Sequence, residues 1–398
     1  MQQKKHIEIN KTEDCCGCRS CEQICPQHCI SMQENEEGFR YPVVDESRCV
    51  NCGLCVSRCP WIEKPAIRIK LDKSIAYAAR IKDDSILKRS SSGGVFSALA
   101  LLALKNGGVV CGCAFDDKLI AKHIFVTDEK ELARLRGSKY VASDTNTVYK
   151  ETQTFLKQGR FVLFSGTPCQ IAGLIKFLNK DYENLLTVEI LCHGTPSQKL
   201  FGKYIDWLSE KRGKSILEYR FRDKSKGWGY LARTEDFPIQ ADVDPYYASF
   251  LRGKTYRYSC YACHYANINR CADITLGDFW GVEVFHPDFY SSKGASCVLL
   301  NTENALAFWA KVKEYLEYVD SGVEKISMRN YNLVKPTIMP KCRKFIYNGI
   351  DYLSFEEYAS KIKLRGNEYL FALIKNHIPK CIRIRLNRVR FFFKGRRT

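Results

Sequence analysis

The segment that decides the fold of the N-terminal part is Cys15-Cys16-Gly17-Cys18-Arg19-Ser20-Cys21-Glu22-Gln23-Ile24-Cys25-Pro26. It places cysteines at positions 15, 18, 21 and 25, directly ahead of a proline. The same spacing returns at Cys49, Cys52, Cys55 and Cys59, again followed by a proline at position 60. In such a run, three cysteines line a tight loop around one iron–sulfur cube, while the fourth points away and binds the neighbouring cube.

The two runs therefore predict a ferredoxin-like module with two 4Fe-4S clusters. We expect one cluster to be bound by Cys15, Cys18, Cys21 and Cys59, and the other by Cys49, Cys52, Cys55 and Cys25. Cys16 falls outside the register and is expected to be a bystander. Gly17 and Gly53 lie inside the loops, where a side chain would crowd the clusters.

Disulfides and zinc are the alternative explanations for a chain with 20 cysteines. The N-terminus has no apolar leader, which predicts a cytoplasmic protein with reduced thiols and argues against disulfides. Zinc sites use two cysteine pairs at a longer separation, unlike these two runs of four.

The rest of the chain alternates apolar strand-like and helical segments. Residues 64–73 read as a linker, and the strand–helix alternation after them predicts a mixed α/β or α+β domain. Strands are expected at 74–81, 109–115, 161–164 and 185–191, and helices at 92–105, 132–135, 147–157, 168–178 and 196–211. The expected domains are a ferredoxin-like domain (1–65), a larger mixed-sheet domain in two parts (74–158 and 159–340) and a basic amphipathic tail (341–398).

Three loops of small residues each follow an expected strand and open a helix, at 91–94, 165–170 and 192–197. Backbone N–H groups in such loops can approach a phosphate or a flavin pyrophosphate, although ordinary helix capping has the same signature. The candidate cofactor-binding residues are Ser92, Gly93, Gly94, Ser138, Lys139, Gly166, Thr167, Pro168, Gln170 and Gly194. Lys139 could contact a cofactor phosphate or be a solvated lysine, and His193 could donate a proton or only bond locally.

A third group of cysteines, Cys260, Cys263 and Cys271, supplies three of the four ligands that a further cube needs. Cys192 and Cys169 are the candidates for the fourth ligand, and we prefer Cys192, because both lie at strand-to-helix turns. A zinc knuckle or free buried cysteines remain the alternatives.

The order of these motifs resembles one known family. Ser92-Gly93-Gly94, Gly137-Ser138-Lys139-Tyr140, Gly166-Thr167-Pro168-Cys169-Gln170, Cys192-His193-Gly194, the third cysteine group and Gly277-Asp278-Phe279-Trp280-Gly281 are similar to the coenzyme F-420 hydrogenase/dehydrogenase beta-subunit family. The resemblance implies FAD, a further cluster and oxidoreductase chemistry, with His193 and Lys139 as candidate catalytic residues. It also implies coenzyme F-420 as the carrier of the founding members, and a link of some relatives to surface-polysaccharide pathways.

The net charge of +18 is concentrated in part at residues 380–398, which hold eight Lys or Arg and no acid. Arginines there alternate with apolar residues, which predicts contact with the inner face of an anionic membrane, with a solvated tail as the alternative. A nucleic-acid partner is not expected, because no such binding pattern is present. The expected partner is a redox protein or small electron carrier, and an electron-transfer adaptor without its own substrate is the alternative function.

Overall fold

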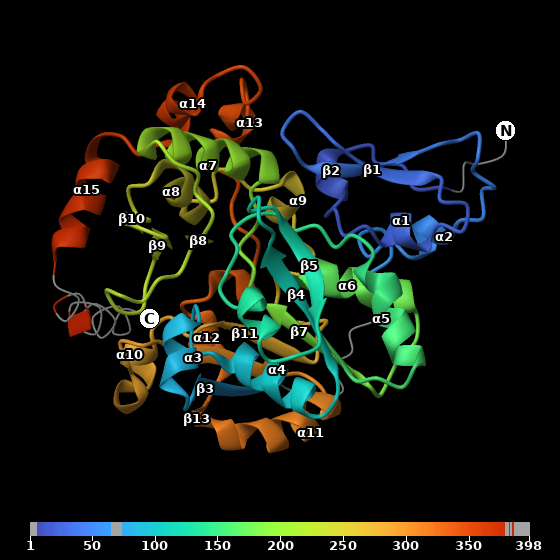
Figure 1. Cartoon of the computed structure of the whole chain (residues 1–398), viewed down its shortest axis with the longest axis horizontal. Helices are drawn as coiled ribbons and strands as arrows, with labels where there is room; N and C mark the ends of the chain where they lie inside the picture. Colours follow the sequence, from blue (N-terminus) through green and yellow to red (C-terminus); the bar gives the residue numbers. More distant parts are fainter. Residues whose placement is uncertain (1–5, 65–73, 379–381, 383, 386–398) are drawn as a thin grey trace.

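The computed structural model describes residues 6–64, 74–378, 382, 384 and 385. The first of these segments forms a small module beside the larger body (Figure 1). Its strands β1 (Ile30–Glu34) and β2 (Arg40–Val44) pair as an antiparallel hairpin. The two cysteine runs lead into the short helices α1 (Ser20–Ile24) and α2 (Leu54–Ser57), and η1 is a single turn at Thr12–Asp14.

The larger body is built on a mixed eight-stranded sheet in the order β13-β3-β12-β11-β7-β6-β4-β5. Three neighbouring pairs of this sheet are parallel, namely β4–β6, β6–β7 and β7–β11. The other four pairs are antiparallel. The strands are β3 (Ile75–Ile81), β4 (Val109–Phe115), β5 (Ala121–Val126), β6 (Val162–Gly166), β7 (Leu185–Ile190), β11 (Ile274–Asp278), β12 (Ser296–Leu300) and β13 (Leu316–Ser321). The predicted mixed α/β architecture is thereby confirmed.

Both faces of this sheet are covered, which explains why its central strands are nearly continuous apolar runs. One face packs against α4 (Val95–Lys105) and α11 (Glu303–Val312), with α3 (Asp84–Arg89) and η2 (Glu131–Leu135) at its edge. The other face packs against α5 (Val148–Lys157) and α6 (Pro168–Leu178) at one end. At its other end lie α10 (Val282–Phe285), α12 (Val323–Ser327) and the turns η3 (Pro287–Phe289) and η5 (Tyr331–Leu333), whereas η4 (Lys313–Tyr315) joins α11 to β13.

An aromatic-rich lobe lies above the sheet in Figure 1. It contains the three-stranded sheet β10-β9-β8, whose strands are Tyr219–Arg220 (β8), Leu231–Thr234 (β9) and Pro238–Gln240 (β10). Its helices are α7 (Gln198–Arg212), α8 (Pro245–Leu251), α9 (Tyr258–Tyr261), α13 (Arg343–Ile346), α14 (Phe355–Ile362) and α15 (Gly366–His377).

This lobe corrects one expectation about the C-terminal residues. Residues 341–364 were grouped with a basic tail, but Phe355, Tyr358 and Ile362 of α14 are buried against the lobe. The apolar face of α14 needs a partner, and α7 and α8 provide it. The tail proper therefore begins later. Most of the expected amphipathic segment 380–398, and most of the expected linker, lie outside the described residues.

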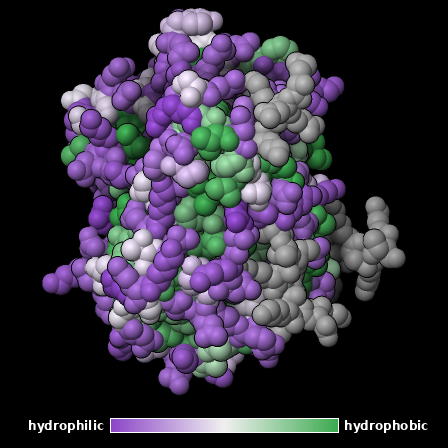
Figure 2. Space-filling view, turned by 90° about the vertical axis from the view of Figure 1, so that its right-hand side faces the viewer, coloured by the Kyte–Doolittle hydropathy of each residue, from purple (hydrophilic) through white to green (hydrophobic). Residues whose placement is uncertain are grey.

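The ferredoxin-like module is held against the body by several long-range contacts. The buried guanidinium of Arg343 donates two hydrogen bonds to the Glu37 carboxylate, at 2.8 and 2.6 Å. On another side, the Tyr265 hydroxyl donates to the Pro60 carbonyl at 2.5 Å, and Trp61 stacks on His264 with ring centroids 4.1 Å apart. Figure 2 shows the side of the molecule that lies at the right in Figure 1, where hydrophilic surface surrounds a narrow hydrophobic band.

Gly93 is required by the packing of the central sheet rather than by the cavity described below. A Cβ atom at this position would lie 2.2 Å from the carbonyl oxygen of Ala79 on β3 and 2.6 Å from the amide nitrogen of Ser296 on β12. Both atoms belong to backbone, which cannot move aside cheaply. Gly93 therefore has a packing role, and its role in cofactor binding stays a prediction.

We expect Gly93→Ala to lower the free energy of unfolding by about 3 kcal/mol, because overpacking a rigid core forces backbone shifts. Gly202→Ala is the matched control, since Gly202 lies inside α7 and nothing surrounds its Cβ position within 4 Å. This control should gain up to about 1 kcal/mol from helix propensity. Urea unfolding of both variants measures the difference, and equal stabilities would contradict the packing role.

Candidate cofactor-binding site

The cysteines of the two runs are neighbours in the ferredoxin-like module, and their division into two ligand sets stays a prediction. Burial raises the pKa of the Cys21 thiol well above its usual value, and its neighbours Cys15 and Cys59 raise it further. Burial likewise raises the pKa of Cys59, next to Cys15. The Gly17 amide donates to Cys15 Sγ at 3.4 Å and the Ile7 amide to Cys55 Sγ at 3.1 Å. Such N–H···S bonds are one way in which proteins tune cluster potentials.

Cys29 is a further residue of this module that the sequence did not single out. Its Sγ lies 3.4 Å from Cys25 Sγ, and burial, then Cys25 and Cys49, raise the pKa of Cys29 to about 12. Cys29 therefore lies between Cys25 and Cys49, in the same buried cluster as Cys21 and Cys55. This placement agrees with the crossed ligand assignment, which stays a prediction.

A cavity of about 770 Å³ lies where the module meets the body, a volume sufficient for a large organic cofactor. All three predicted loops and the segment at Lys139 border it. Its lining includes the predicted residues Ser92, Gly94, Ser138, Lys139, Gly166, Thr167, Pro168, Gln170, Cys192, His193, Gly194, Cys260 and Cys263. The structure thus brings together residues that are up to about 170 positions apart in sequence.

Lys139 is half-buried at the cavity wall. Its ammonium group donates to the carbonyl oxygens of Arg134 at 3.1 Å and Arg136 at 2.9 Å. Burial lowers the pKa of Lys139 to about 8, and only Cys113 opposes this shift. The lysine is therefore held in place with one donor to spare. Its neighbour Ser138 bonds through its amide and hydroxyl to Ser91 Oγ, at 2.7 and 3.0 Å.

The loop before α6 is a capping box, so part of its signature has a local explanation. The Thr167 side chain and amide both bond to Gln170 Oε1, at 3.0 and 2.9 Å. The Gln170 amide group also donates to Ser143 Oγ at 3.0 Å. Thr167 and Gln170 shape the cavity wall through these bonds, and contact of either with a cofactor stays a prediction.

His193 lies half-buried beside the cavity. Burial lowers its pKa, with Asp278 opposing the shift and Arg222 adding to it. Its imidazole is therefore neutral near pH 7 and can accept or pass on a proton. Gly194 has φ +137°, and a Cβ there would overlap the Tyr256 ring at 2.2 Å, so this glycine is required for close packing.

The third group of cysteines borders the same cavity. Burial raises the pKa of Cys192, and Cys260, Cys169 and Cys263 raise it further, so these four thiols are mutual neighbours. Cys169 is also a neighbour of Cys260 and Cys263, whose pKa values rise to about 11 and about 12, mainly through burial. No three His, Cys, Asp or Glu side chains of the described residues are grouped tightly enough for a single metal ion.

Cys271 differs from the other members of this group. Its thiol donates to Glu189 Oε2 at 3.2 Å and to the Pro168 carbonyl at 3.4 Å. Glu189 is fully buried and forms an ion pair with Arg270. Burial raises the pKa of Cys271, and the Glu189 carboxylate raises it further, which favours a protonated thiol.

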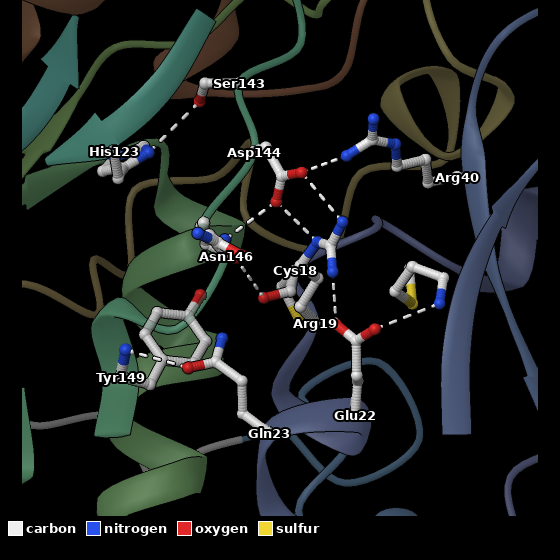
Figure 3. A network of polar contacts seen from close by, with 12 residues as sticks. Cys18, Arg19, Glu22, Gln23, Arg40, His123, Ser143, Asp144, Asn146 and Tyr149 are labelled. Carbon is white, nitrogen blue, oxygen red and sulfur yellow. Dashed lines mark hydrogen bonds and ion pairs between the residues drawn. The ribbon is translucent and has the colours of Figure 1, made fainter. Parts of the chain in front are cut away.

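A network of polar contacts joins the cavity wall to the ferredoxin-like module (Figure 3). Asp144 accepts hydrogen bonds from Arg19, whose Nη2 lies 2.8 Å away, and from Arg40 of β2. Next to it, the Thr145 hydroxyl donates to the Cys18 carbonyl at 2.9 Å. The segment that begins at Lys139 in the cavity wall therefore continues to Asp144 and Thr145, which bond to the ferredoxin-like module.

The same interface brings the first cysteine run against α6. Gly173 faces Cys18, and a Cβ there would lie 3.0 Å from its Sγ. At the start of α6, a hydrogen bond between Cys169 and Cys16, and then burial, raise the pKa of Cys169. Cys16, expected to be a bystander, is thus the residue at which the two cysteine groups meet. Only the tertiary structure could reveal this, because the two cysteines are far apart in sequence.

A dicluster cysteine module fixed against a mixed α/β domain, with a second cysteine group and a shared cavity between them, defines an iron–sulfur electron-transfer protein of the oxidoreductase type. The chain belongs to the coenzyme F420 hydrogenase/dehydrogenase beta-subunit family: the N-terminal family model matches residues 76–150 and the C-terminal model residues 159–322. A 4Fe-4S dicluster domain model matches residues 14–61.

Curated relatives agree with this membership. An uncharacterised protein of Methanocaldococcus jannaschii is 23% identical over 80% of this chain and 94% of its own length. The coenzyme F420 hydrogenase subunit beta of Methanococcus voltae is 25% identical over 66% of this chain and 86% of its own. The coenzyme F420-dependent sulfite reductase of Methanocaldococcus jannaschii is 25% identical over 49% of this chain, but the match spans only 30% of that protein.

A solved structure, the F420-reducing [NiFe] hydrogenase complex from Methanosarcina barkeri, matches 73% of this chain and 90% of its own with a TM-score of 0.46 and 18% identity. Within the residues that the structure describes, no helix is both long and apolar enough to cross a membrane.

His123 is a cavity-lining residue that sequence reasoning missed, because a single histidine in a strand carries no motif. It is 4% exposed, its Nε2 lies 3.2 Å from the Ser165 carbonyl, and its ring stacks on Phe164. Its Nδ1 lies 3.4 Å from Ser143 Oγ. Burial lowers the pKa of His123 to about 4, so the folded protein keeps this imidazole neutral.

We expect His123 to make stability depend on pH. The unfolded histidine binds a proton below about pH 6.5 and the folded one only below about pH 4, so stability is lost as pH falls between these values. The loss should approach about 3 kcal/mol at pH 4. Urea unfolding of wild type and His123→Gln across pH 4–7 isolates this contribution. Parallel curves for the two proteins would contradict it.

Proposed function

We propose that the protein is an iron–sulfur flavoprotein oxidoreductase that passes electrons between its clusters and a two-electron carrier bound in the 770 Å³ cavity. The observation that carries this proposal is the shared position of that cavity. Cys16 of the ferredoxin-like module and Cys169, Cys192, Cys260 and Cys263 of the body all line it. Electrons that enter at the module therefore have a short path to whatever the cavity binds.

We propose a third 4Fe-4S cluster, bound by Cys169, Cys192, Cys260 and Cys263. The neighbour relations among these thiols support this set, while Cys271 has Cys169 as its neighbour in the group. Cys271 instead has the buried Glu189 carboxylate as its hydrogen-bond acceptor. A thiol that donates to a carboxylate is poorly suited to be an iron ligand, which must be a thiolate.

We propose FAD as the cavity's cofactor. The donor set fits this group: Lys139 supplies a half-buried ammonium for a phosphate, and the loops at 91–94 and 192–195 bring the backbone close to the cavity. A bound flavin would connect one-electron delivery to two-electron chemistry. His193 would hold or hand over a proton at its neutral imidazole.

The names of the relatives support coenzyme F-420 as a candidate carrier, without extending to the whole-complex activities of those proteins. A redox partner protein or small carrier would exchange electrons at the module. The link to surface-polysaccharide pathways stays a prediction of the resemblance alone. An electron-transfer adaptor without its own substrate is the alternative that the following experiment separates.

We expect anaerobically purified protein to contain about twelve irons, twelve sulfides and one extractable FAD per chain, since each cube holds four irons. Cys169→Ser should lose about four irons and leave the module's clusters in place, whereas Cys271→Ser should keep all twelve. Iron, sulfide and flavin analysis with visible spectra measures these values.

Eight irons without flavin would replace the oxidoreductase proposal by the adaptor. Loss of four irons in Cys271→Ser, with retention in Cys169→Ser, would reverse the ligand assignment. Fewer than eight irons in the wild type would contradict the two-cluster module itself.

We also propose that the C-terminal end contacts an anionic membrane. On α15 the side chains of Leu370, Phe371 and Ile374 are 53–70% exposed, while Ala372 packs against the body. The sequence that follows, 380–398, supplies eight cations and no acid. Exposed apolar residues followed by cations are typical of interfacial helices.

We expect the full chain to co-sediment with vesicles that contain anionic lipid and a truncation after His377 to remain in the supernatant. Vesicles of neutral lipid are the control, and binding should weaken in high salt, because the attraction is electrostatic. Equal sedimentation of both chains would show that the tail has no such role.

A further inference from the structure

Arg257 stands where three cysteine-bearing segments meet. Its backbone amide donates to the Thr195 carbonyl at 3.0 Å, three residues after Cys192. Its own carbonyl accepts from the Cys260 amide at 3.0 Å, at the start of α9. The backbone of Arg257 therefore ties together two of the segments that carry the proposed third cluster.

The Arg257 side chain extends into the ferredoxin-like module. Its Nε donates to the Cys15 carbonyl at 2.6 Å and its Nη2 to the Arg40 carbonyl at 2.8 Å. The guanidinium carbon lies 4.0 Å from the centre of the Tyr41 ring. A Cβ on Gly17 would lie 3.0 Å from Arg257 Nη1, so the glycine in the first cysteine loop makes room for this arginine.

Among the residues that the structure describes, this guanidinium has no carboxylate partner. Arg257 is 5% exposed, and in the described part of the chain no Asp or Glu forms an ion pair with it. The titratable side chains closest to it are instead Cys15, Tyr41, Cys16 and Cys260. A buried, unpaired cation is costly unless something negative offsets it. Cubes bound by thiolates carry that negative charge, and each gains one more on reduction.

We propose that Arg257 is a positioning residue whose buried charge favours the reduced state of the cluster bound by Cys15, Cys18, Cys21 and Cys59. It acts in the same way on the cluster near Cys260. The charge shifts the equilibrium between the oxidised and the reduced cluster. Reduction adds one electron to the cube, and no bond forms or breaks. The part that concerns the third cluster rests on the proposed function, whereas the part that concerns the module's first cluster does not.

The experiment is a dithionite titration of the purified, cluster-loaded protein, followed by EPR at fixed potentials. Arg257→Gln removes the charge and should shift the first cluster's reduction equilibrium at least tenfold toward the oxidised form, which is about 59 mV for one electron. Arg257→Lys keeps the charge and should shift it less than about threefold. The cluster bound by Cys49, Cys52 and Cys55 is the internal reference and should not move.

Arg160→Gln is the matched control, because Arg160 is an arginine remote from the cysteines that bonds to the Gly107 carbonyl. All three potentials should stay at wild-type values in this variant. Equal shifts in Arg257→Gln and Arg257→Lys would overturn the charge effect in favour of hydrogen-bond geometry. An unchanged first cluster in Arg257→Gln would overturn it outright.

If Arg257→Gln loses iron, Arg257→His is the variant that tests the proposal. An imidazole at this position is charged at low pH and neutral at high pH, so the first cluster should become easier to reduce as pH falls from 8 to 5.5, beyond any wild-type change. The same pH dependence in both proteins would contradict the proposal. A wild type with eight irons and no flavin would refute the proposed function and still leave this measurement valid.

Discussion

The close approach of Cys18 to Gly173 is the constraint on which the rest of the arrangement depends. A Cβ at Gly173 would lie 2.9 Å from the Tyr149 hydroxyl oxygen and 3.0 Å from Cys18 Cβ and Sγ, so glycine lets α6 lie directly against the first cysteine loop. Because Cys169 stands at the first turn of the same helix, this contact places the body's cysteines next to those of the module. This close contact therefore sets how near Cys169 lies to the first cysteine run.

Charged contacts hold that geometry without having to supply much net stability. Asp144 bonds to Arg19 and Arg40 on one side of the module, and Glu37 bonds to Arg343 on the other. Buried ion pairs often stabilise little beyond the cost of removing their charges from water, but they penalise every other orientation. Their contribution here is to fix how the module sits. Arg257, which forms no ion pair with a carboxylate of the described residues, donates its hydrogen bonds across the same interface.

Local patterns determine what the sequence could predict. The two cysteine runs and the strand at 109–115 were predicted correctly, because spacing and apolar periodicity are properties of neighbouring residues. The packing of α14 and the contact between Cys16 and Cys169 were missed, since both depend on residues far apart in the chain. His123 carries no motif at all, and its low pKa arises only after burial. The ligands of the third cysteine group remained ambiguous because Cys271 differs from its neighbours only through Glu189.

The three small-residue loops show that a glycine before a helix can be required either by a ligand or by packing within the fold. Glycine is needed wherever backbone approaches a ligand, and equally wherever it approaches another element of the fold. Gly93 lies against β3 and β12, and Gly194 against the Tyr256 ring, so both are explained by packing. The cavity's chemistry must then come from the side chains that these glycines allow to converge. Lys139, with a pKa of about 8, and His193, with a lowered pKa, are two titratable groups at its wall, and their catalytic roles stay proposals.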